Sequence, residues 1–73
     1  MIKAGIIGAA GFTGGELMRL LVNHPKVELA FAHSNSQPGK AVTQIHKDLK
    51  GDIDLNFKKS DPPDSLDLIF LCM

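Results

Sequence analysis

The sequence predicts an α/β fold built on a parallel sheet, and three observations support this. A short, mostly apolar run at residues 2–7 leads directly into a cluster of glycines. An amphipathic stretch follows from residue 13, and a second apolar run occupies residues 27–32. Strand, glycine turn, helix and strand in this order form a βαβ unit, whose strands are parallel and whose first strand is buried on both faces.

The first run and the amphipathic stretch define the strand and helix of this unit. Thr13 with Glu16 three residues later fits a capping box, which places the helix start near residue 13. Pro25 ends the helix, because the residue before a proline is pushed out of the helical region. Three apolar side chains share one helix face by their spacing and are expected in the core: Leu17, Leu20 and Leu21.

The second half of the chain is less regular. Residues 33–40 are rich in Ser, Asn, Pro and Gly and are expected to form a loop. Residues 41–52 are expected to be irregular with one helical turn, and the alternating residues 53–57 form a short, half-exposed strand. Residues 66–72 are a strand of fully buried type. One helix covers only one face of such a sheet, so we expect these 73 residues to be the front piece of a longer protein.

Composition excludes several classes of function. Eight basic and eight acidic residues cancel, which argues against nucleic acid or an anionic membrane as partner, and no apolar run approaches the ~20 residues that span a bilayer. A single cysteine, Cys72, excludes an internal disulfide framework and favours the cytoplasm. We expect Cys72 to be a small apolar residue of the last strand rather than a nucleophile. His33 and His46 lack metal-ligand spacing with each other and with Cys72, so no metal site is expected.

The glycines carry the main functional signal. Gly8, Gly11 and Gly14 follow a strand and open a helix, which is a variant of the dinucleotide-binding fingerprint with a longer first gap. One glycine makes the tight turn, one lets a pyrophosphate approach the backbone and one lets the helix pack on the strand. We expect the pyrophosphate at Gly11, with a positive φ there. The alternative is that the glycines only tighten a turn.

This motif predicts a Rossmann-like domain whose helix N-terminus faces a dinucleotide phosphate. The N–H groups of residues 11–14 are expected to face the ligand, with Glu16 pointing away. No carboxylate occurs between Glu28 and Asp48, which permits the 2′-phosphate of NADP rather than selecting NAD. The candidate cofactor-binding residues are Gly8, Ala10, Gly11, Phe12, Thr13, Gly14, Ser34, Asn35, Ser36 and Lys40.

Four segments together suggest a family: GAAGFTGGELMRLLVNHP, HSNSQPGK, HKDLKG and DLIFLCM. They resemble the N-terminal part of N-acetyl-gamma-glutamyl-phosphate reductase. The resemblance implies NADPH-dependent reduction of an acyl phosphate to an aldehyde in arginine biosynthesis. The cysteine and histidine that the family uses lie beyond these residues, so no catalytic residue is assigned here. The family often has Ser and Arg flanking the first loop serine, where this chain has His33 and Asn35, so we expect only a moderate preference for NADP.

Two alternatives stay open at this point. An aspartate-semialdehyde dehydrogenase or a similar reductase would share the glycine turn. A regulator that binds NADP without chemistry would need the turn alone. For the full-length protein we expect a small-molecule substrate and a homo-oligomer.

Overall fold

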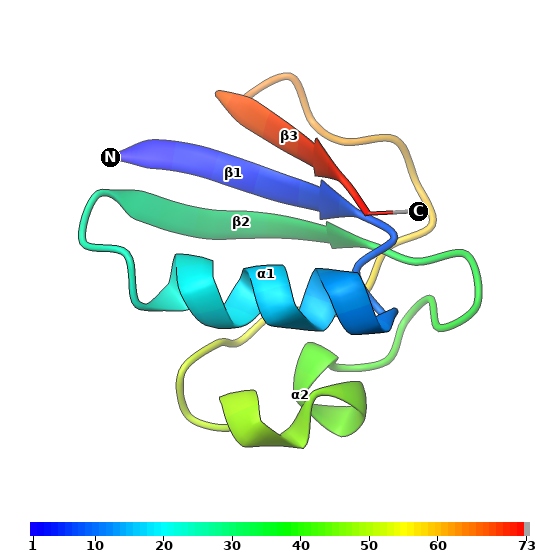
Figure 1. Ribbon diagram of the computed structural model, residues 1–73. Helices are drawn as coiled ribbons and strands as arrows, with labels where there is room; N and C mark the ends of the chain where they lie inside the picture. The colour runs from blue at the N-terminus through cyan, green and yellow to red at the C-terminus, as the bar shows by residue number, and fades with distance from the viewer. Residues whose placement is uncertain (73) are drawn as a thin grey trace.

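The computed structural model describes residues 1–72 as a three-stranded sheet with helices packed below it (Figure 1). The strands lie in the order β2-β1-β3, and β1 pairs with both neighbours in parallel. This confirms the predicted α/β fold and the βαβ unit. The elements are β1 (Ile2–Ile7), α1 (Phe12–Val22), β2 (Val27–His33), α2 (Val42–Ile45), the 3₁₀ helix η1 (Lys47–Leu49) and β3 (Leu68–Leu71).

Helix α1 covers one face of the sheet with Leu21, as predicted, and with Leu17 partly buried against the core. Its buried residues are Gly14, Gly15, Met18 and Leu21. Leu20 is 71% exposed, so its assignment to the core was wrong. Gly14 lets the helix approach the backbone of the turn after β1, at Gly8 and Ala9, and Met18 and Leu21 are buried on the same side, which leaves Leu20 on the far side of the helix.

α1 begins at Phe12, close to the predicted start near residue 13, but its N-cap differs from the prediction. The N-cap is Gly11, with extended φ and ψ of −77° and 174°, and no side chain caps the helix. The predicted capping box at Thr13 is therefore wrong, because Thr13 lies inside the first turn. Glu16 instead pairs with Arg19, with 2.8 Å between Oε1 and Nη1, so it points along the helix surface as expected.

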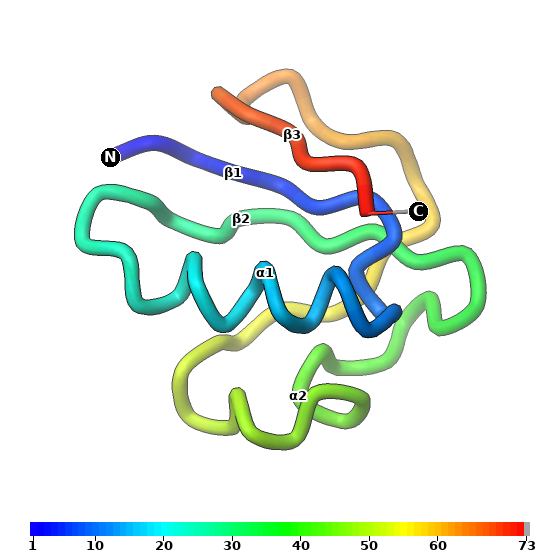
Figure 2. Tube along the Cα trace, in the orientation of Figure 1, coloured from blue at the N-terminus to red at the C-terminus, as the bar shows by residue number. Residues whose placement is uncertain are grey.

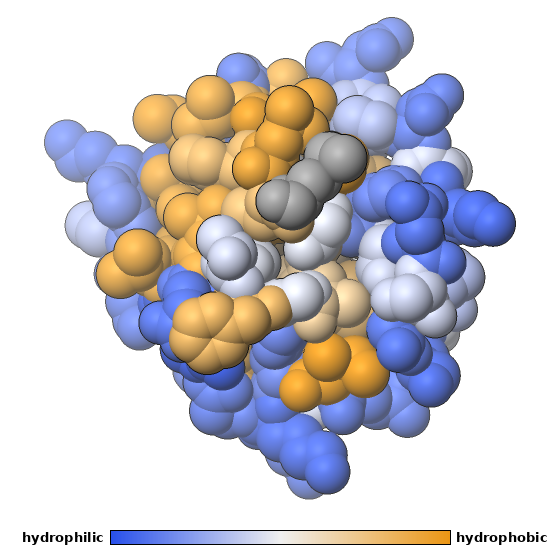
Figure 3. All heavy atoms as spheres, turned by 45° about the vertical axis from the view of Figure 1, so that its right-hand side comes forward, coloured by the Kyte–Doolittle hydropathy of each residue, from blue (hydrophilic) through white to orange (hydrophobic). Residues whose placement is uncertain are grey.

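The last strand is shorter and more exposed than predicted. β3 spans Leu68–Leu71, and Leu68, Ile69 and Leu71 are 45%, 44% and 72% exposed. The prediction of a fully buried strand failed because β3 is an edge strand in the described part of the chain and nothing there covers these side chains. Hydrophobic residues gather over the upper part of the view in Figure 3, where β3 lies.

Residues 41–52 form the expected irregular segment with short helices, but the predicted strand at 53–57 is absent. Burial alternates there as the pattern indicated, with Phe57 buried and its neighbour Asn56 exposed. Each pairing goes to a different partner: Ile53 to Lys50, Asn56 to Ala41 and Lys58 to His33. No continuous ladder can form from these single bridges. The segment can be followed in Figure 2 from α2 back to the carboxyl end of β2.

The short helices form a second layer against α1. Arg19 of α1 pairs with Glu16 and with Asp48 of η1, which joins the two layers at the surface. Within residues 1–72, none of the helices combines the length and apolar character needed to cross a membrane.

Candidate nucleotide-binding site

A cavity of about 270 Å³ opens at the carboxyl ends of β1 and β2. Two segments far apart in the sequence form it, the glycine turn after β1 and the loop after β2. Figure 1 shows both at the same edge of the sheet, beside the N-terminal end of α1. Ligands of parallel α/β sheets bind at this edge. The lining residues are Ile7, Gly8, Ala10, Gly11, His33, Ser34, Asn35 and Ser36.

The glycine turn is shaped by Gly8 rather than by Gly11. Gly8 has a φ of +80°, in the left-handed region that favours glycine. Gly11 has a φ of −77°, so the expected positive φ at this residue was wrong. The difference follows from the position of the sharp reversal, which comes directly after β1, whereas Gly11 already leads into the helix.

Gly8, Gly14 and Gly15 lack side chains because protein atoms occupy the space. A Cβ at Gly8 would lie 2.2 Å from the Cys72 carbonyl oxygen, and one at Gly14 would lie 2.8 Å from backbone atoms of Ala9. A Cβ at Gly15 would lie 2.6 Å from the ring of His46. Gly8 and Gly14 therefore serve the turn and the packing of the helix, two roles that both interpretations of the motif allow, and Gly15 lies outside the motif.

Gly11 is different. A Cβ there would come no nearer than 3.8 Å to any described atom outside the neighbouring residues, namely the Gly8 carbonyl oxygen. Gly11 also lines the cavity. No close contact among the described residues explains its missing side chain.

The first turn of α1 presents unpaired backbone donors beside this space. The first intrahelical bond runs from the Gly15 N–H to the Gly11 carbonyl, at 3.0 Å. The N–H groups of Phe12, Thr13 and Gly14 consequently have no acceptor among the described residues. The first turn carries no acidic residue, so the partial positive charge of the helix end is not neutralised there. These features suit an anion.

The loop after β2 is organised by Ser34, which is 3% exposed. Its Oγ accepts hydrogen bonds from the N–H groups of Ser36 and Gln37, at 3.3 and 3.0 Å. The Ser36 hydroxyl lies 3.4 Å from the same oxygen. Asn35 is exposed on the cavity wall. Since Ser34 uses two of the loop N–H groups, the hydroxyls and the Asn35 amide are the main donors left to a ligand.

The structure brings together six of the ten candidate residues: Gly8, Ala10, Gly11, Ser34, Asn35 and Ser36. Phe12, Thr13 and Gly14 lie next to them in α1. Lys40 does not line the cavity, and its backbone instead pairs with Phe57. Ile7 and His33 complete the lining because β1 and β2 end there.

Cys72 and the histidines form no catalytic or metal-binding cluster in the described part. Cys72 follows β3, packs partly on the core and donates its N–H to the Ile7 carbonyl at 2.9 Å. Between residues 1 and 72, no three His, Cys, Asp or Glu side chains are placed to hold a metal ion. His46 is buried beneath the turn and bonded to it, a role for which the sequence carried no signal.

The chain is similar to proteins named N-acetyl-gamma-glutamyl-phosphate reductase. It is 51% identical to the one from Bacteroides thetaiotaomicron over 99% of this chain and 22% of the relative. It is 55% identical to the one from Methanosarcina barkeri over 100% of this chain and 23% of the relative. The chain thus spans less than a quarter of the length of these relatives.

A solved structure shares the fold. An aspartate semialdehyde dehydrogenase from Candida albicans, determined with NADP, superposes with a TM-score of 0.77 at 24% identity, over 100% of this chain and 23% of that chain. Residues 3–73 match the family described as semialdehyde dehydrogenase, NAD binding domain. The chain therefore belongs to this NAD-binding family.

Proposed function

We propose that residues 1–73 are the cofactor-binding front of an NADPH-dependent N-acetyl-gamma-glutamyl-phosphate reductase. The observation that carries the proposal is Gly11, whose side-chain space is empty of protein and opens on the cavity between the glycine turn and the loop after β2. The relatives with this name are 47–55% identical over almost the whole chain. Aspartate semialdehyde dehydrogenase matches at 24%, which supports the fold alone.

The residues present fit a dinucleotide. The pyrophosphate would lie over Gly11 and accept hydrogen bonds from the free N–H groups of Phe12, Thr13 and Gly14. The Ala10 N–H is a further donor on the same wall. Among residues 1–72, no carboxylate lines the cavity, so a 2′-phosphate would meet no repulsion from them there.

The loop after β2 would bind the adenosine ribose of the cofactor, which carries the 2′-phosphate in NADP. Ser34 and Ser36 offer hydroxyls and Asn35 offers an amide to the 2′-phosphate. In the described part of the chain no Arg or Lys lines the cavity, so the contacts would be neutral hydrogen bonds, weaker than bidentate pairs with Arg. This arrangement supports a moderate preference for NADP over NAD.

When bound, NADPH supplies the hydride that reduces the substrate carbonyl. This part of the chain binds and orients the cofactor, and we assign no catalytic residue within it. The exposed apolar side chains of β3 support a Rossmann-like domain that continues after residue 73. The resemblance further leads us to propose a cytoplasmic homo-oligomer, which light scattering of the full-length protein would test.

The deciding experiment uses the full-length protein with NADPH or NADH and two acyl-phosphate substrates. We expect NADPH-dependent reduction of N-acetyl-gamma-glutamyl phosphate, slower turnover with NADH and little reduction of aspartyl phosphate. A preference for aspartyl phosphate would favour the semialdehyde dehydrogenase alternative. Tight NADPH binding without turnover of any acyl phosphate would favour a cofactor sensor and overturn the proposed activity.

A further inference from the structure

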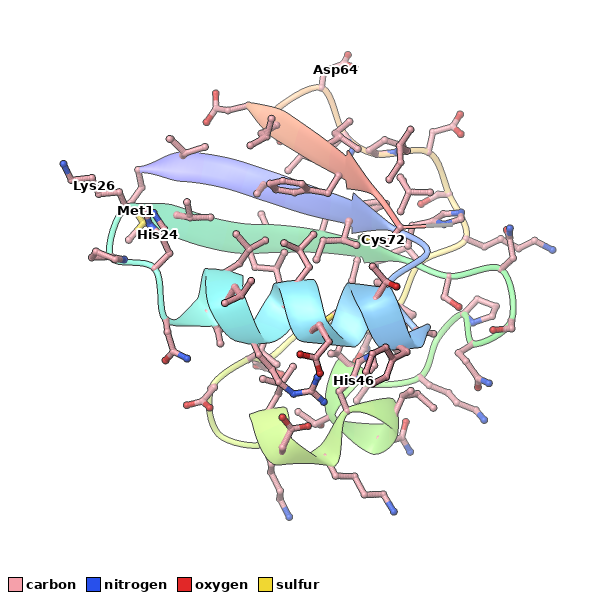
Figure 4. The ribbon with its side chains drawn as sticks, in the orientation of Figure 1. Met1, His24, Lys26, His46, Asp64 and Cys72 are labelled. Carbon is pink, nitrogen blue, oxygen red and sulfur yellow. The ribbon has the colours of Figure 1, made fainter. Side chains whose placement is uncertain are left out.

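His46 lies against the glycine turn and does not line the cavity. It is 7% exposed, and its Nε2 lies 2.8 Å from the carbonyl oxygen of Ala9. Figure 4 places it between the N-terminal end of α1 and the short helix α2. A carbonyl oxygen can only accept a hydrogen bond, so Nε2 carries a hydrogen and donates the hydrogen bond to the Ala9 carbonyl.

The ring of His46 is held firmly. It packs edge-to-face on buried Phe57, with 6.4 Å between ring centroids and 72° between planes. On the other side it fills the space that a Cβ of Gly15 would need, at 2.6 Å. Gly15 thus makes room for the imidazole, although it lies outside the Gly8, Gly11, Gly14 spacing.

Both backbone polar groups of Ala9, the N–H and the carbonyl, make hydrogen bonds. Its N–H donates to the His33 carbonyl at 2.8 Å, and its own carbonyl accepts from His46. The Ala9 carbonyl and the Ala10 N–H belong to one planar trans peptide group, in which they point in opposite directions. Because His46 holds the carbonyl on its side, the Ala10 N–H points to the opposite side of the turn.

Ala10 lines the cavity, and no backbone hydrogen bond of the described residues uses its N–H. We propose that His46 is a positioning residue, whose hydrogen bond to Ala9 aims the Ala10 N–H at the cofactor pyrophosphate. This inference rests on the proposed cofactor binding and adds a residue that does not touch the cofactor. Without the bond, the peptide can rotate and the donor is no longer fixed.

The test compares two variants of the full-length protein that differ in one donor. His46→Gln keeps an N–H donor at about the reach of Nε2, whereas His46→Met has a similar length and no donor. We expect His46→Met to weaken NADPH binding about 5- to 10-fold, the effect of one hydrogen bond, and His46→Gln to stay within about 3-fold of the parent. Fluorescence titration of NADPH measures both.

A second ligand separates positioning from general damage. Adenosine 2′-phosphate has no pyrophosphate, so it should bind the parent and both variants alike. Equal weakening of the two ligands by His46→Met, or NADPH binding equal to the parent, would overturn the inference. A parent that does not bind NADPH would instead overturn the proposed function.

Gly15→Ala provides an independent test if His46→Met does not fold. Its Cβ would push the imidazole away without removing it, while alanine favours the helix. We expect the same selective loss of NADPH affinity with a folded protein. Parent-like NADPH affinity in a folded Gly15→Ala variant would contradict the role of His46.

Discussion

The Cα of Gly8 faces the backbone carbonyl oxygen of Cys72, which lies 2.2 Å from the position that a Cβ of residue 8 would take. This contact ties the turn after β1 to the residue that follows β3. Two effects therefore oppose a side chain at position 8, the clash and the φ of +80°.

Gly8→Ala should destabilise the full-length protein by about 2–4 kcal/mol, from backbone strain plus overpacking. Gly39→Ala is the matched control, because Gly39 has a φ of +85° with nothing within 4 Å of its Cβ position. It should cost only about 1–2 kcal/mol, the strain alone. Urea denaturation measures both, and equal losses would show that the contact with Cys72 is unimportant.

Gly11→Ser should separate folding from binding. Serine is a good N-cap and its hydroxyl would accept from the N–H groups of the first turn, so stability should be equal or slightly higher. The same N–H groups are those proposed for the pyrophosphate, so the dissociation constant for NADPH should rise at least about tenfold, the effect of ~1.4 kcal/mol. Parent-like NADPH affinity in titration would mean that Gly11 does not face the cofactor.

The sequence predicted the parts of this fold that depend on local pattern. The bounds of β1 were correct because an apolar run followed by glycines has one favourable arrangement. The position of Gly11 in the site followed from its place between a strand and a helix. The capping box at Thr13 failed because Gly11 already supplies the extended N-cap, and spacing alone cannot distinguish two residues so close together.

Features that depend on distant contacts could not be predicted. Leu20 and Leu21 both fit an apolar stripe, and only the docking of α1 on the sheet decides that Leu20 is exposed. His46 lies 37 residues from Ala9 along the chain, so no spacing rule points to their hydrogen bond. Lys40 does not line the cavity, and its backbone carbonyl accepts from the Phe57 N–H, so its contact with a phosphate stays a prediction.

Stability at acid pH should depend on Asp48. Its hydrogen bond with Arg19 lowers the pKa of Asp48 below its ordinary value of 3.8. A lowered folded-state pKa gives stability that is present above the ordinary value and lost as the pH falls through the lowered one. The parent should therefore lose more thermal stability than Asp48→Asn between pH 6 and about pH 3.

Thermal melts across this pH range measure the difference, and the exposed Asp52→Asn serves as control. High salt should reduce the difference in melting temperature between the parent and Asp48→Asn at pH 7, because the Arg19 and Asp48 side chains are both accessible to solvent. If the melting temperatures of the parent and Asp48→Asn change with pH by the same amount, the Arg19–Asp48 pair does not contribute to stability.

The choice of cofactor should depend on Asn35. Asn35 is exposed on the cavity wall, whereas Ser34 is buried, so Asn35 can take a charge without disturbing the fold. Asn35→Asp adds a negative charge at nearly constant shape and should lower kcat/KM with NADPH about tenfold or more, with little change for NADH. Asn35→Arg adds a bidentate phosphate partner and should strengthen the preference for NADPH.

Asn56→Asp is the matched control, because it makes the same change of charge at an exposed residue that does not line this cavity. It should leave the ratio of the two efficiencies unchanged. The assignment of the loop after β2 to the 2′-phosphate requires Asn35→Asp and Asn35→Arg to move this ratio in opposite directions. If both variants keep the ratio of the parent, the 2′-phosphate binds elsewhere and the loop only closes the cavity.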